Sequence, residues 1–71
     1  MFKIGDLIKG TNTKYDYTDI DMKIGKVEYV WICPITKRKY MDIRIIEHSN
    51  SNWNGYSFPA LNEQEYFELI K

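Results

Sequence analysis

Cysteine is nearly absent from this 71-residue sequence, in which Cys33 is the single example. One cysteine excludes a disulfide within the chain and any zinc site built from several thiolates. The stretch Met1–Asp6 lacks the apolar segment of a secretion signal. No apolar run approaches the roughly 20 residues that cross a bilayer. We therefore expect a cytoplasmic protein with no membrane contact.

Net charge is absent as well, because ten lysines and arginines balance ten aspartates and glutamates. A net charge of zero provides no bulk attraction to nucleic acid or to a membrane surface, although a local basic patch can still bind nucleic acid. Low net charge also favours association between proteins. A protein partner is therefore expected, and a homodimer is an open alternative.

Motifs for enzyme chemistry are missing too. The chain has no glycine-rich phosphate loop, no metal-spaced histidine pair and no serine-centred elbow. Cys33 and His48 are its only thiol and imidazole, and nucleophilic catalysis would require them to be adjacent. The acidic residues lack the spacing and the glycine of a calcium loop. We predict no enzyme, no catalytic residue, no metal and no cofactor.

The most informative stretch that is present is Met22–Ile32, the longest run of β-branched and aromatic residues. Such a run predicts a strand. Strict alternation puts three apolar side chains on one face, which we predict to be core: Val27, Tyr29 and Trp31. The other face begins charged and becomes apolar at Val30 and Ile32. This change indicates a strand that bends, or one that a neighbour covers late.

Four shorter strands surround this one. Alternation in the third segment predicts that Met41, Ile43 and Ile45 face the core. Pro34 ends the long strand before a basic turn, and Asn54-Gly55 is the strongest tight-turn signal. The predicted short strands are Leu7–Lys9, Tyr40–Glu47, Tyr56–Leu61 and Tyr66–Ile70.

Two connections carry further signals. Residues 11–22 show no periodicity and are predicted to form a long loop, of a length that is usually functional. Asn62–Glu65 resembles a capping box, with Asn62 as the N-cap, and predicts a short 3-10 or α turn before the last strand. The alternative is an amphipathic helix from Glu63 to Ile70 in place of the turn and strand.

This order of elements resembles an SH3-like small barrel. Phe2–Asp6 is similar to the F-K-x-G-D opening of such barrels, and Ile24–Val27 is similar to the G-x-V start of their second strand. The resemblance implies an all-β, mostly β, protein in which residues 1–71 form one five-stranded SH3-like barrel. Tyr15-Asp16-Tyr17 is similar to the tyrosine motif of true SH3 domains. The paired tryptophans and the P-x-x-Y element are missing, so recognition of proline-rich peptides is not expected.

The pairing of Tyr15 and Thr18 with Met22 and with Gly25–Val27, and the ending Tyr66–Ile70, are similar to short barrels encoded by phages and mobile elements. This resemblance implies a non-enzymatic accessory or anti-defence protein. Such a protein would inhibit a host factor by direct binding in the cytoplasm of the host cell.

The eleven aromatic residues are more than so small a core easily encloses, so some should lie on the surface. Those in or beside loops, with nearby acids, are the predicted protein-binding residues: Tyr15, Asp16, Tyr17, Asp19, Trp53 and Tyr56. The alternative is that Tyr15, Trp53 and Tyr56 cap the open ends of the barrel. A second hypothesis is nucleic-acid binding through the basic turn and its flanking aromatic residue, namely Lys37, Arg38, Lys39 and Tyr40.

Overall fold

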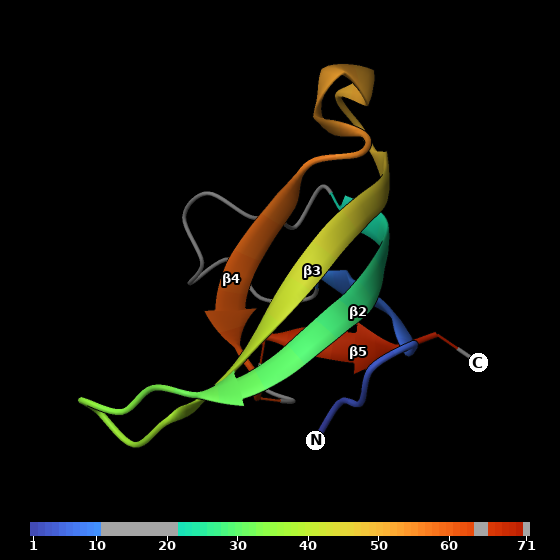
Figure 1. Cartoon of the computed structure of the whole chain (residues 1–71). Helices are drawn as coiled ribbons and strands as arrows, with labels where there is room; N and C mark the ends of the chain where they lie inside the picture. Colours follow the sequence, from blue (N-terminus) through green and yellow to red (C-terminus); the bar gives the residue numbers. More distant parts are fainter. Residues whose placement is uncertain (11–21, 64–65, 71) are drawn as a thin grey trace.

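Five antiparallel strands form a single sheet in the computed structural model, which describes residues 1–10, 22–63 and 66–70. The order in the sheet is β4-β3-β2-β1-β5 (Figure 1). A short 3-10 helix, η1, connects β3 to β4, and the described residues contain no α-helix. The prediction of a mostly β protein is therefore confirmed. The elements are β1 (Leu7–Gly10), β2 (Met22–Ile32), β3 (Lys39–His48), η1 (Ser51–Trp53), β4 (Ser57–Leu61) and β5 (Phe67–Leu69).

The sheet surrounds one core, but its two edge strands do not pair. Phe67 of β5 and Ala60 of β4 are both buried in that core, although their strands lie at opposite ends of the sheet order. Figure 1 shows β5 running at a steep angle to β3. Among the described residues no strand pair joins β4 to β5. The fold shown is an open five-stranded sheet, and its closure into an SH3-like barrel remains a prediction.

β3 follows its predicted alternation and forms the centre of the core. Met41 and Ile43 are fully buried and Ile45 is nearly so, whereas Arg44 between them is exposed. Alternation works here because one face of β3 packs against apolar side chains and the other faces solvent. The buried apolar residues are Phe2, Ile8, Met22, Val27, Met41, Ile43, Ile45, Ala60 and Phe67.

β2 departs from the prediction at a β-bulge between Val27 and Tyr29. Val27 lies opposite Ile43 and Tyr29 lies opposite Asp42, so two steps along β2 match one step along β3. An extra residue reverses the face that all following side chains occupy. Val27 is fully buried, whereas Tyr29 is 64% and Trp31 38% exposed. The prediction that Tyr29 and Trp31 belong to the core is therefore wrong.

The last element is a strand, as the turn-plus-strand prediction requires. β5 pairs with β1, so the alternative helix over residues 63–70 is wrong. The N–H of Tyr66 donates to the carbonyl of Glu63 at 3.3 Å, which places a turn directly before β5. Residues 64–65 of the predicted capping box lie outside the described residues.

Asn62, predicted to cap that turn, bonds to the N-terminal segment. Its side chain is buried, its Oδ1 accepts the N–H of Phe2 at 2.9 Å, and its Nδ2 donates to the carbonyl of Phe2 at 3.0 Å. One amide thus satisfies both backbone groups of a residue 60 positions away. The side chain ties the N-terminal segment to the residue that follows β4, and it fixes Phe2 in the core.

Candidate protein-binding surface

Three aromatic side chains lie on the outer face of the sheet and form what we term the outer strip: Tyr29, Trp31 and Tyr40. The bulge places the first two there, and the alternation of β3 places Tyr40 there. Trp31 and Tyr40 lie directly opposite each other on β2 and β3. Their rings stack with centroids 4.8 Å apart and planes inclined by 16°. The indole Nε1 of Trp31 donates to Oδ1 of Asp42 at 3.1 Å. Trp31 and Tyr40 are therefore held in a fixed geometry before any ligand arrives.

A polar network lies beside the outer strip and holds the bulge residue, Glu28. Oε2 of Glu28 accepts from Nε of Arg44 at 2.8 Å, and Oε1 accepts from the hydroxyl of Ser57 at 3.1 Å. The hydrogen bond from Arg44 is the main cause that lowers the pKa of Glu28. A lowered carboxyl pKa stabilises the fold above the unfolded-state value, and this contribution is lost as the pH falls through the folded-state value. The network connects β2, β3 and β4 across the outer face.

The basic turn lies at the end of the β2–β3 hairpin, next to the outer strip. Nη2 of Arg38 lies 2.8 Å from Oε1 of Glu63, and this bond raises the pKa of the guanidinium. One of the three predicted phosphate contacts is therefore already neutralised. Lys37 and Lys39 are exposed.

The backbone of this turn contains a strained residue, Lys37, with φ of 63°. Its N–H donates to the carbonyl of Cys33 at 2.8 Å, and this bond closes the turn. We expect Lys37→Gly to stabilise the protein by about 0.5–1 kcal/mol, since relief of left-handed strain exceeds the added freedom of the unfolded chain. Urea denaturation measures the change. Ile35→Gly is the matched control, because Ile35 is 88% exposed and has no positive φ, so glycine there should destabilise.

The predicted binding residues that the structure describes, Trp53 and Tyr56, lie at the opposite end of β3. Their rings meet edge to face at 5.8 Å, and His48 lies 6.3 Å from Trp53. Both are more than half exposed. A turn brings them together, in which Gly55 has φ of 90° and the N–H of Tyr56 donates to the carbonyl of Trp53. The other predicted residues, Tyr15, Asp16, Tyr17 and Asp19, lie outside the described residues.

The catalytic pair considered from the sequence is not assembled. Cys33 follows the end of β2 at the hairpin turn, whereas His48 ends β3 at its far end. The ten residues of β3 separate them by roughly 30 Å at the usual rise of a strand. Hydrogen bonds to Thr36 lower the pKa of the Cys33 thiol. Within the described ranges, no cluster of His, Cys, Asp and Glu is arranged to hold a metal.

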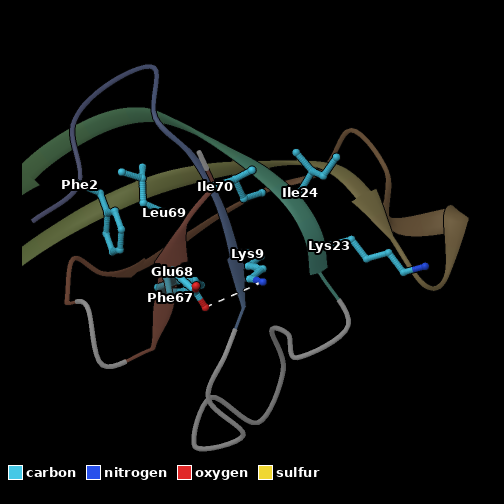
Figure 2. Close-up of a pocket in the computed structure, with 8 residues that line it drawn as sticks. All are labelled: Phe2, Lys9, Lys23, Ile24, Phe67, Glu68, Leu69 and Ile70. Carbon is cyan, nitrogen blue, oxygen red and sulfur yellow. Dashed lines mark ion pairs between the residues drawn. The ribbon is translucent and has the colours of Figure 1, made fainter.

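A hollow of about 860 Å³ lies between the N-terminal segment and strands β1, β2 and β5 (Figure 2). Its lining is mostly aliphatic and aromatic, with one exposed ion pair between Lys9 and Glu68 at 3.9 Å. The side chains in Figure 2 do not converge on a common point, since Lys23 extends away from the others. The lining residues of the hollow are Phe2, Lys9, Lys23, Ile24, Phe67, Glu68, Leu69 and Ile70.

The sequence did contain a signal for the exposed part of the outer strip. Val30 and Ile32 are apolar on a face of β2 that begins with Lys26 and Glu28. A face that changes from charged to apolar within one strand is what a one-residue bulge produces. The strand was predicted to bend, but the exchange of faces that exposes Tyr29 and Trp31 was missed.

Comparisons of this chain with protein-family models, curated proteins and solved structures find no match. No helix in the part of the chain that the structure describes is long and apolar enough to cross a membrane. The outer strip and the basic turn beside it are therefore interpreted from their own geometry.

Proposed function

We propose that this protein is a small non-enzymatic binding module that docks onto another protein through the outer strip. The observation that carries this proposal is the exposure of Tyr29 and Trp31 on a preformed surface. Rigid aromatic side chains lose little conformational freedom on binding and are the commonest anchors of protein interfaces. Pro59 and Leu61 of β4 lie opposite Asp42 and Tyr40 and extend the same face.

A protein partner fits this surface better than nucleic acid does. Glu28 and Asp42 place carboxylates on the same face, where they would oppose phosphates. Trp31 and Tyr40 stack on each other, so one face of each ring is covered and is not available for stacking with a base. Arg38 is paired with Glu63. Nucleic-acid binding through Lys37 and Lys39 is the second candidate, supported by their position beside the stacked rings.

The biological role that we propose follows the resemblance to short barrels of phages and mobile elements. A module of this kind would block a host factor by covering its surface, as an accessory or anti-defence protein does. Such an inhibitor requires no chemistry of its own, and aromatic and hydrogen-bonding side chains of the kind found on the outer strip support such a role.

We expect Trp31→Ala to weaken partner binding by roughly 30-fold, as truncation of an interface anchor does. A tagged protein recovers the partner from the native host, and titration calorimetry measures the loss for each variant. Trp53→Ala is the matched control, because it removes an exposed tryptophan at the other end of β3. If Trp53→Ala released the partner and Trp31→Ala did not, binding would be assigned to the surface that contains Trp53 and Tyr56 instead.

A salt titration distinguishes the two candidate functions. Binding of single- or double-stranded DNA or RNA that weakens steeply with salt, and that Lys37→Glu with Lys39→Glu abolishes, would favour nucleic acid. Protein binding through the outer strip predicts little effect of that double change. No nucleic-acid binding at low salt would remove the second candidate.

A further inference from the structure

Among the residues that the structure describes, none pairs with the outer edge of the second half of β2, which we term the open edge. β1 pairs with β2 only as far as Lys26, and the turn at Gly5 and Asp6 then bonds both backbone groups of Val27. Beyond that point no described strand pairs with residues 29–32 on the side away from β3. Figure 1 shows the β2–β3 hairpin extending beyond the other strands.

This edge lacks the features that normally prevent edge-to-edge pairing, although the other two edges have them. β4 contains Pro59, and β5 is three residues long and includes Glu68. The open part of β2 and the cysteine that follows it, residues 29–33, contain no charge and no proline. Its side chains Val30 and Ile32 are 38% and 57% exposed. An apolar, uncharged open edge of this kind is a template for another strand.

The backbone groups available on this edge follow from the hairpin ladder. The N–H of Cys33 donates to the carbonyl of Arg38 at 2.9 Å, so this pair is hydrogen-bonded. Hydrogen-bonded and non-hydrogen-bonded pairs alternate in an antiparallel ladder. Trp31 therefore bonds across to Tyr40, whereas Val30 and Ile32 direct their N–H and carbonyl groups outward.

We propose that a second copy of this chain pairs with this edge, antiparallel, about a two-fold axis at Trp31. Val30 of each copy then exchanges two backbone hydrogen bonds with Ile32 of the other, and all outward groups of both residues are satisfied. Trp31 faces Trp31 of the second copy on the outer face, and Tyr29 faces Cys33. Every side-chain pair in this segment is uncharged, so the surface is complementary to itself.

The surrounding structure fixes this register. An axis at Val30 would bring Cys33 of the second copy against Val27, where the Gly5–Asp6 turn already occupies the backbone. An axis at Ile32 would place Pro34 of the second copy opposite Val30, and proline has no N–H to donate to the carbonyl of Val30. Only the axis at Trp31 uses the whole open edge. The dimer goes beyond the proposed function and would place two outer strips side by side.

Proline at Val30 tests the pairing, because it removes an outward N–H without removing a bond to β3. We expect the wild-type chain to form a dimer in sedimentation equilibrium and Val30→Pro to be monomeric, with a circular dichroism spectrum like that of the wild type. Ile32→Lys introduces like charges on the same edge without changing the backbone, and it should also give a monomer. A monomeric wild-type chain at millimolar concentration would overturn the proposal. It would do so even if the edge were then found to pair with an extended segment of another protein.

Cross-linking tests the register separately. In a Cys33→Ser background, Trp31→Cys should form a disulfide-linked dimer under mild oxidation, because residues facing each other in a non-hydrogen-bonded pair have the spacing that a disulfide requires. Ile35→Cys in the same background is an exposed control away from the axis, and it should cross-link at least about tenfold more slowly. Equal rates would overturn the axis at Trp31. Val30→Pro leaves the outer strip intact, so loss of the dimer and loss of a protein partner are measured independently.

Discussion

Replacing Asn62 with alanine is expected to destabilise the protein by about 2–5 kcal/mol, since each buried backbone group left unpaired costs about 1–3 kcal/mol. Asn62 satisfies both the N–H and the carbonyl of Phe2, and both residues are buried. Without the amide, the segment before β1 must either bury these groups unpaired or leave the core. Urea denaturation measures the loss. A cost below about 1 kcal/mol would show that water replaces the amide at no penalty.

Asn62→Asp extends this test to pH. Burial beside the carbonyl of Phe2 should raise the pKa of the new carboxyl above its unfolded value of about 3.9, since the charged form is desolvated and faces an acceptor. The protonated acid can donate to that carbonyl and accept from the N–H of Phe2. The variant should therefore be close to the wild type at low pH and lose stability as the pH rises through the folded-state pKa.

The control for Asn62→Asp is Asn50→Asp. Asn50 is exposed, and its Oδ1 accepts the N–H of Asn52 at 3.1 Å, a role that a carboxylate also fills. This variant should show the pH dependence of the wild type. If the stability of both variants changed with pH to the same extent, Asn62 would be more accessible to solvent than its burial indicates.

Gly25→Ala is expected to cost about 1–3 kcal/mol, as overpacking of a filled core does. A Cβ at this position would lie 2.7 Å from Sδ of Met22 and 2.8 Å from Cγ2 of Ile43. The thioether of Met22 is the end of a flexible chain and can move. Ile43 is fully buried at the centre of β3, so it cannot move without displacing other core residues. Denaturation with urea, followed by circular dichroism, measures the effect.

Lys26→Ala is the control for Gly25→Ala, because Lys26 is the next residue of β2 and is exposed. It should change stability by less than about 0.5 kcal/mol. Equal stability of Gly25→Ala and wild type would mean that β2 and β3 separate more easily than their contacts suggest.

The local part of the fold was predictable from the sequence. β2 has the predicted bounds, Met22–Ile32, because a run of β-branched and aromatic residues is hard to place elsewhere. The core face of β3 was correct because its alternation is uninterrupted from Met41 to Ile45. Where the hydrophobic pattern continued over several residues and the packing followed it, periodicity was sufficient to predict the strand and its core face.

The remaining features depend on single residues or on distant partners. One inserted residue in β2 moves Tyr29 and Trp31 from the predicted core to the outer face, because strict alternation assumes a strand without an insertion. The bonds between Asn62 and Phe2 join residues far apart in the chain, whereas a capping motif is a local pattern. The outer strip was therefore not among the predicted protein-binding residues, although Tyr40 was in the nucleic-acid hypothesis.

The pairing of β1 with β5 sets the order in which the sheet assembles. β2, β3 and β4 join through short turns, so they can form early as a three-stranded unit. Ile8 pairs with Leu69, and closing a loop of about sixty residues costs roughly 3.6 kcal/mol of chain entropy before any contact compensates. We therefore expect β1 and β5 to join last, and the rate of folding to depend on this encounter more than on the hairpins.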